Sequence, residues 1–212
     1  MTVKGSRRPY DSSGRQAQAR RSQEAVLEAA QRQFLRAGYG ATTIAAIAAD
    51  AGVSVETIYK AFGGKPGLVR AIYDRGLRGQ GPISAYERSD QMRAREADPT
   101  TIMRKWGELT TEVAAQVTPI RLLIRAAAAT DPEIAGLLKD SDKERLERMR
   151  HHAEFLAQRG YLRDGVTTST ASDILYTCSS VELYELLVLQ RGWSLPDFAQ
   201  FVSNFMISGL LK

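Results

Sequence analysis

Residues 51–62 read AGVSVETIYKAF, and this stretch decides how the N-terminal third of the chain folds. Gly52 follows an apolar segment and is the residue type that commonly ends a helix in the left-handed conformation. Ser54 comes two residues later and is a good N-cap for a second helix. Ile58 and Phe62, four residues apart, would share the buried face of that helix. The stretch therefore predicts two short helices joined by a sharp turn.

The opposite face of the second helix is polar. At 100° per residue, Glu56, Tyr59 and Lys60 project away from the buried direction, and Thr57 lies on the flank. Val55 is ambiguous, because it falls about 60° from the buried direction. A helix-turn-helix places such a face in the major groove of DNA. The alternative, from this pattern alone, is a plain helical hairpin with a solvated face.

Helix signals continue on both sides of this stretch. They are the four-residue steps of Val26, Ala30 and Phe34 from about Gln23, the terminating Gly38 and Gly40, the N-cap candidates Thr42 and Thr43, and the Lys65–Pro66 start of a fourth helix. Further along, helix starts are expected at Asp98–Pro99, Asp131–Pro132, Thr170 with Asp173, and Ser194, and helix ends at Gly160 and Gly192. We expect Thr118–Pro119 to break a helix. No stretch shows sustained period-two alternation, so the chain is predicted to be all-α.

Composition divides the chain into an arm and two domains. Residues 1–20 are polar and basic and are predicted to form a flexible basic arm. Residues 21–78 are predicted to be the helix-turn-helix domain, and residues 79–212 a second helical domain. The polar residues 79–97 are predicted to be a linker, with at most a short helical piece.

Positive charge is concentrated at the N-terminal end. The 212-residue chain has a formal net charge of +5 and a sequence pI of about 9.4. Residues 1–80 contain 13 Lys or Arg against 6 Asp or Glu, whereas residues 81–212 contain 16 against 18. A basic end on a near-neutral body suggests a polyanion partner, although a solubilising tail would give the same pattern.

Several classes of protein do not fit the sequence. No apolar run approaches the roughly 18–20 residues needed to cross a bilayer. The basic N-terminus lacks the apolar core of a signal peptide. Cys178 is the only cysteine, so the chain cannot form an intrachain disulfide. We therefore expect a cytoplasmic protein without a membrane partner.

Catalytic and metal-binding patterns are not found in the sequence. Adjacent helical residues point about 100° apart, so His151 and His152 make a poor metal site and are predicted to be a solvated patch. There is no glycine-rich phosphate loop and no G-x-S-x-G signature. We expect no catalytic residues, no cofactor and no metal, and therefore not an enzyme.

The segment GYGATTIAAIAADAGVSVETIYKAFGGKPGLVRAI, residues 38–72, resembles the DNA-binding domain of the TetR family of transcriptional regulators. The matching features are Phe34 and Gly38–Tyr39, Thr42–Thr43, Ile47–Ala48, Ala51–Gly52–Val53–Ser54, Thr57–Ile58–Tyr59, Phe62, and Lys65 with Leu68. They cover about 50 contiguous residues with the spacing of the family.

The resemblance implies a role for each matching position. Thr43, Tyr59 and Lys65 match positions that contact phosphate. Val55, Glu56 and Thr57 match the entrance of the recognition helix, which reaches bases or nearby phosphates, and Lys60 adds a cation to the same predicted face. The family often has Lys–Gly where this chain has Val55 and Glu56, so the operator sequence is expected to differ. A valine offers only apolar contact, and a glutamate accepts from cytosine N4 or repels phosphate.

The resemblance also implies that the C-terminal domain binds an effector and forms a dimer. Two apolar stripes, Ile174, Cys178, Val181, Leu187 and Val188, and Phe198, Phe201, Val202, Phe205 and Met206, are expected to serve both the core and a four-helix dimer interface. The expected effector-contacting residues are Met103, Trp106, Leu109, Leu122, Met149, Phe155 and Tyr176. Their large apolar side chains suggest a small apolar effector.

Together these features predict a ligand-responsive, homodimeric DNA-binding regulator. We expect it to repress by binding a pseudopalindromic operator in double-stranded DNA and to be released by its small-molecule effector. A small-molecule-binding helical protein without specific DNA binding is the nearer alternative, and a non-specific architectural DNA binder is another.

Overall fold

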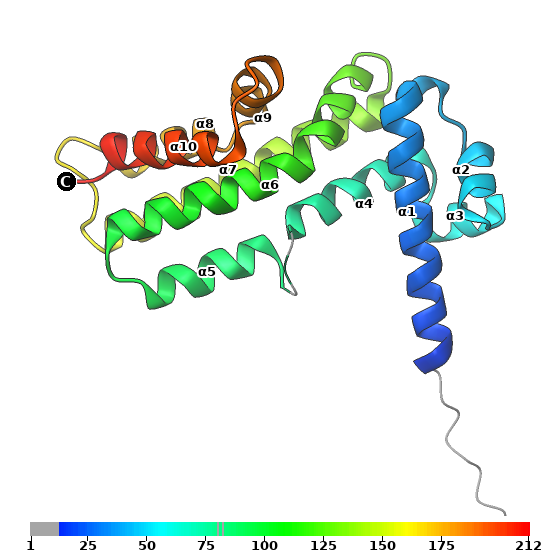
Figure 1. Ribbon diagram of the computed structural model, residues 1–212, viewed down its shortest axis with the longest axis horizontal. Coiled ribbons are helices and arrows are strands. Elements are labelled where there is room, and N and C mark those ends of the chain that lie inside the picture. The colour runs from blue at the N-terminus through cyan, green and yellow to red at the C-terminus, as the bar shows by residue number, and fades with distance from the viewer. Residues whose placement is uncertain (1–12, 80, 82) are drawn as a thin grey trace, which may run out of the picture.

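The computed structural model describes residues 13–79, 81 and 83–212, and the part it describes is helical, with no strand (Figure 1). The elements are α1 Ser13–Ala41, α2 Ile44–Ala51, α3 Val55–Phe62, α4 Lys65–Arg78, α5 Ala85–Arg95, α6 Pro99–Ala127, α7 Pro132–Gln158, α8 Thr168–Cys178, α9 Val181–Tyr184, the π-helix η1 Glu185–Gln190, and α10 Leu195–Leu210. The predicted all-α fold class is confirmed. Helices α1 to α3 lie at one end of an elongated molecule, and the C-terminus lies at the opposite end.

The turn between α2 and α3 forms as the sequence predicts. Gly52 is left-handed, with φ 67° and ψ 33°, a conformation that side chains with a Cβ rarely adopt. Ser54 caps α3, because its side chain accepts a hydrogen bond from the Thr57 backbone N–H at 3.1 Å. Ile58 is fully buried in one core with residues of α1, α2 and α4, and Phe62 is partly buried in the same core.

The core of the first four helices continues into the long C-terminal helices. Phe34 of α1, Ile47 of α2 and Leu68 of α4 are fully buried and belong to one cluster with Ile120 and Ile124 of α6. Polar contacts reinforce this junction. The Tyr39 hydroxyl donates to Asp131 Oδ2 at 2.9 Å, at the start of α7. Helices α6 and α7 therefore pack directly against the domain that contains α2 and α3.

A second core lies between α6, α7, α8 and α10. Its buried members include Ile102, Met103, Trp106, Leu156, Phe198, Val202 and Met206. Helix α10 runs along α6, and Gly107 lets the two backbones approach closely (Figure 1). A Cβ at Gly107 would lie 2.0 Å from Ser203 Oγ and 2.8 Å from the Ala199 carbonyl oxygen.

The structure corrects two expectations near the N-terminal domain. Residues 13–20 are not part of an arm, because α1 extends back to Ser13; the stretch from Arg15 to Arg20 contains no glycine or proline that would stop it. Residues 1–12 lie outside the described part. The expected linker 79–97 is largely α5, which Ser84 caps by accepting from the Glu87 backbone N–H at 3.1 Å.

The structure also corrects the expected helix breaks in the C-terminal domain. Pro119 lies inside α6 without breaking it, because the burial of its neighbours Val117, Thr118 and Ile120 offsets the lost backbone hydrogen bond, which costs about 3 kcal/mol. The N-cap of α8 is Thr167 and not Thr170.

The expected single helix before Gly192 is divided into α8, α9 and η1. The division occurs at Ser179 and Ser180. Arg145 of α7 donates to the Tyr176 carbonyl oxygen at 2.6 Å and thereby caps the end of α8. Ser180 then caps α9 by accepting from the Leu183 backbone N–H at 3.2 Å. A partner from another helix therefore determines where this segment breaks.

Candidate nucleic-acid interface and effector cavity

Helix α3 presents the polar face that the sequence predicts. Val55, Glu56, Thr57, Tyr59 and Lys60 are exposed, whereas Ile58 is buried. The ambiguous Val55 is thus exposed. Ser54 and Thr57 hydroxyls lie 2.9 Å apart, which holds the first turn in a fixed conformation. A rigid helix with acceptor, cation and aromatic hydroxyl on one outward face has the shape and chemistry that reads a major groove.

Thr43 caps the second helix of the motif. Its Oγ1 accepts from the Ala46 backbone N–H at 3.1 Å, and the side chain is exposed at the N-terminus of α2. The hydroxyl hydrogen remains available to donate outward. Helix N-termini favour anions, so this position suits a DNA phosphate.

Lys65 has a structural role that sequence reasoning missed. Its Nζ donates to the carbonyl oxygens of Tyr39, at 2.8 Å, and Thr42, at 3.1 Å. The same ammonium lies 4.3 Å from the centre of the Tyr39 ring. It therefore joins the start of α4 to the segment between α1 and α2. Only one of its three N–H groups is left for a phosphate.

A cavity of about 880 Å³, its open mouth included, lies between α4, α5, α6, α7 and α8, with contributions from α9 and α10. Of the expected effector-contacting residues, Trp106, Leu109 and Met149 line it. On α6 the lining residues Trp106, Leu109, Val113, Val117 and Arg121 recur at helical spacing along one face.

Four expected contacts do not line this cavity, namely Met103, Leu122, Phe155 and Tyr176. Met103 is fully buried in the second core, and Leu122 faces about 100° away from Arg121. Phe155 packs edge-on against Trp106, with ring centres 6.4 Å apart. The Tyr176 ring is covered by the Arg145 guanidinium at 3.5 Å.

Polar residues that sequence reasoning missed form one wall of the cavity. Arg145, Arg148 and His152 of α7 lie at spacings of three and four, with Met149 on the same face, and Arg121 joins them from α6. This helical spacing was the available signal, but the high charge of the segment suggested a solvated surface. None of the described residues that line the cavity is acidic.

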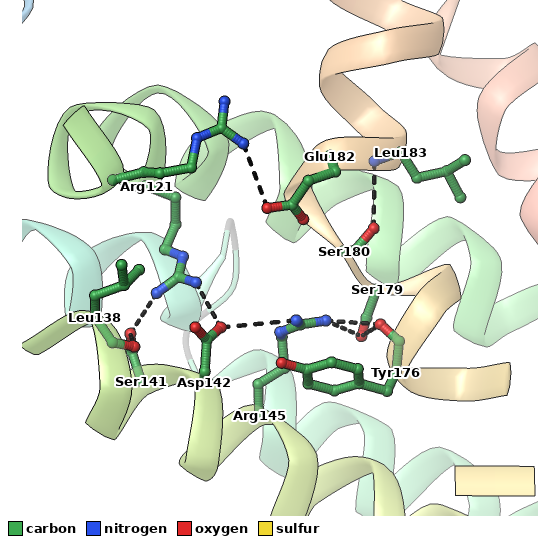
Figure 2. Close-up of polar contacts among 11 residues, drawn as sticks. Arg121, Leu138, Ser141, Asp142, Arg145, Tyr176, Ser179, Ser180, Glu182 and Leu183 are labelled. Atoms are coloured by element: carbon green, nitrogen blue, oxygen red, sulfur yellow. Dashed lines mark hydrogen bonds and ion pairs between the residues drawn. The ribbon is translucent and has the colours of Figure 1, made fainter. Parts of the chain in front are cut away.

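Hydrogen bonds hold the arginines in place. Arg121 donates to Asp142 at 2.6 Å and to Ser141, and Arg145 donates to Ser179 at 3.2 Å (Figure 2). Figure 2 shows that Asp142 lies between the two guanidiniums of Arg121 and Arg145. These side chains are positioned before any ligand enters.

Arg148 is held by contacts with α5. It donates to Asp90 at 2.7 Å and 3.1 Å and to the Tyr86 carbonyl oxygen at 2.9 Å. Because these contacts use its terminal nitrogens, the guanidinium lies fixed against the cavity wall.

His152 is buried and His151 is exposed, so the expectation of a solvated pair is wrong for His152. The 100° between adjacent helical residues explains the difference, since only one of the two faces the cavity. Burial, and then the positive charges of Arg148 and Arg93, hold the pKa of His152 well below its usual value. The imidazole is therefore neutral at pH 7. The described residues include no cluster of side chains that could hold a metal ion.

Helix α4 connects the cavity to the recognition helix. Tyr73 and Leu77 of α4 line the cavity, and α4 begins directly after α3. Gly76, between them in sequence, packs so closely on α6 that an added Cβ would lie 3.0 Å from Val117 Cγ2. A ligand that displaces α6 or α4 would therefore shift the position of α3.

A separate apolar surface lies at η1 and α10. Its exposed members are Leu186, Leu189, Leu195, Phe201 and Phe205, which we name the C-terminal apolar face. The predicted stripe of α10 is divided between core and surface, whereas no residue of the other predicted stripe is exposed. In α10, Phe198, Val202 and Met206 are buried in the core, whereas Phe201 and Phe205 are exposed. Exposed aromatic side chains that pack together, as Phe201 and Phe205 do, are typical of a protein interface.

Comparison with known proteins agrees with this architecture. Residues 26–72 match the family model described as bacterial regulatory proteins, tetR family. The match contains α2 and α3 and most of α1 and α4. A search of curated proteins finds no significant match. No helix in the described part of the chain is long and apolar enough to cross a membrane.

Solved structures share the fold over nearly the whole chain. NalD, the secondary repressor of the MexAB-OprM multidrug efflux pump in Pseudomonas aeruginosa, has a TM-score of 0.71 at 18% identity, covering 92% of this chain and 98% of NalD. The complex of SmeT with triclosan has a TM-score of 0.70 at 18% identity, covering 90% and 92%. GusR of Salmonella enterica has a TM-score of 0.62 at 17% identity, covering 89% and 95%.

Proposed function

We propose, from the premise that the chain belongs to the TetR family of bacterial regulatory proteins, that it represses transcription as a homodimer until a small molecule enters its cavity. The family and the fold support a DNA-binding regulator. One observation supports control by a ligand: α4 follows α3 in the chain and also forms part of the cavity wall.

DNA binding is proposed for residues 21–78. Lys60, Tyr59 and Thr43 would contact phosphates and hold the register, because hydroxyls and cations position a protein on the duplex. Val55, Glu56 and Thr57, at the start of α3, would lie nearest to base edges. Lys65 would contribute through the fold of the motif, and through one remaining N–H group.

Dimerisation is proposed at the C-terminal apolar face within residues 79–212. Phe201 and Phe205 stack with ring centres 6.3 Å apart, and Trp193 packs edge-on against Phe201 at 5.5 Å. Such aromatic clusters dominate the energy of protein interfaces. A two-fold dimer would place two copies of α3 for successive major grooves, which are about 34–36 Å apart.

Release from DNA would follow from a ligand that prefers one arrangement of α4 and α6. A ligand shifts a conformational equilibrium only by its differential affinity for the two states. The solved NalD is described as a repressor, and SmeT was solved with triclosan, so proteins with this fold are known in both roles. In this chain, a ligand bound in the cavity would change the spacing of the two α3 helices of the dimer.

Fluorescence anisotropy tests the DNA-binding half of the proposal. A duplex enriched from a random library by the protein should bind at least about 10³-fold more tightly than a shuffled duplex. Lys60→Met should weaken binding to both duplexes. Lys139→Met, an exposed lysine on α7 with the same change of charge, should leave both affinities unchanged. Equal affinity for the two duplexes would instead support a helical ligand-binding protein without specific DNA recognition.

A further inference from the structure

We propose that the cavity takes an organic carboxylate, a molecule with one acidic group and an apolar body. This inference rests on the proposed function, because it names the chemical class of the effector for the same cavity. It follows from the arginine wall, which consists of Arg121, Arg145, Arg148 and His152.

The charges around the arginine wall do not balance. Arg121, Arg145 and Arg148 line the cavity, and their carboxylate partners are Asp142 and Asp90, which do not line it. Asp90 is also paired with Arg93 at 3.1 Å. Four guanidiniums therefore share two carboxylates within the described part of the chain. An uncompensated buried charge is costly, so an added anion would be stabilised here.

Two polar nitrogen atoms in the wall have no hydrogen-bond partner among the described residues. They are Arg148 Nε and His152 Nδ1. The Arg148 side chain is 11% exposed and His152 is 6% exposed, so water has little access to either. Buried donors without a partner are rare. A carboxylate is a suitable partner for either atom, because carboxylate oxygens can accept from an arginine Nε–H and from a histidine in the tautomer with hydrogen on Nδ1.

The rest of the cavity fits an apolar body. Leu109, Val113 and Val117 of α6, Leu175 of α8 and Met206 of α10 supply apolar lining. The single indole N–H of Trp106 is already used, because it donates to Ser89 Oγ at 2.9 Å. The arginine wall would repel a cationic ligand. A neutral ligand would leave the positive charge of the arginine wall unbalanced. The combination selects a molecule with an acidic end and an apolar end.

Wild-type protein provides the first test. Octanoate and 4-phenylbutanoate are each compared with the primary amide of the same skeleton by isothermal titration calorimetry. A charge-assisted pair with arginine should make at least one acid bind about tenfold or more tightly than its amide. The proposal is overturned if the amides bind as tightly as the acids, or if neither acid binds at 1 mM.

Variants of one helix provide the second test. Arg148→Met should weaken binding of the acid about tenfold or more and leave amide binding unchanged. Arg150→Met removes an exposed arginine from the same helix and should alter neither. If Arg148→Met does not fold, Arg148→Lys keeps the charge but removes Nε, and it should still weaken the acid selectively. An equal loss for acid and amide would contradict the assignment.

Anisotropy with the enriched duplex separates this inference from the proposed function. An acid that binds the protein and releases DNA supports both. An acid that binds the cavity without releasing DNA supports the carboxylate site and contradicts its role as effector site. Neutral compounds that release DNA, when the acids do not bind, would support the regulator and overturn the carboxylate site.

Discussion

Replacing Lys65 with methionine should show whether this lysine mainly stabilises the fold or mainly contacts DNA phosphate. The Lys65 ammonium donates to the carbonyl oxygens of Tyr39 and Thr42 and lies against the Tyr39 ring. Methionine keeps most of the side-chain length and removes the charge and both hydrogen bonds. We therefore expect Lys65→Met to destabilise the junction between α1, α2 and α4.

The expected magnitude follows from these contacts. Hydrogen bonds to a charged group contribute about 1.5–3 kcal/mol each, and partial exposure of Lys65 lowers the total to roughly 3 kcal/mol. For a chain of this length the loss corresponds to a fall in Tm of about 6–12 °C. Lys60, which is exposed on α3, should show the opposite behaviour. Lys60→Met should leave Tm unchanged and lower the salt slope of DNA binding by about 1.8 per dimer.

Thermal unfolding and anisotropy at several salt concentrations measure both effects, with DNA binding measured well below the Tm of the variant. Lys65→Met should lower Tm while changing the salt slope much less than Lys60→Met does. An unchanged Tm together with a slope lowered by about 1.8 would refute the structural role and make Lys65 chiefly a phosphate contact.

Three further predictions follow from the packing. Phe205→Glu should shift the sedimentation coefficient towards the monomer, whereas Leu35→Glu, on the exposed side of α1, should not; a dimer that survives Phe205→Glu would place the interface elsewhere. Gly107→Ala should lower stability in urea by about 1–3 kcal/mol, because the new Cβ would clash with Ser203 and Ala199; an unchanged midpoint would show that α10 is not held so closely. His152, whose pKa is lowered on folding, binds fewer protons folded than unfolded, so stability should fall as pH drops below about 6.5, by up to about 1.4 kcal/mol per pH unit for each chain. His152→Gln should remove that part of the pH dependence, and an unaltered profile would contradict the assignment.

The helix-turn-helix could be predicted from sequence because its signals are local. Gly52, Ser54, Ile58 and Phe62 each act within one turn of helix or turn, through left-handed geometry, capping or helical spacing. The same locality explains the correct starts at Asp98, Asp131 and Ser194, each of which accepts from backbone N–H groups of its own helix.

Features that depend on distant partners could not be predicted in the same way. Pro119 lies in a continuous helix because its neighbours are buried by other elements, and α8 ends where Arg145 of another helix donates to the Tyr176 carbonyl oxygen. Lys65 matches a family position, but its two carbonyl acceptors lie on a segment more than twenty residues away.

The residues that line the proposed effector cavity also differ in how far they could be predicted. Trp106, Leu109 and Met149 were predictable as large apolar residues on inward faces. The arginine wall was not, because charged residues on a long helix usually face solvent. Their burial also depends on Asp142 and Asp90, which pair with Arg121 and Arg148 and offset part of the cost of burying the guanidiniums.

Genomic footprinting of the purified protein tests the central claim most directly. Protected sites should be pseudopalindromic, with half-site centres one helical turn, about 10–10.5 base pairs, or a multiple of it apart. Tyr59→Ala combined with Lys60→Met should abolish this protection. Sites that lack two-fold symmetry, or protection spread evenly over the genome, would contradict recognition of an operator by two copies of α3.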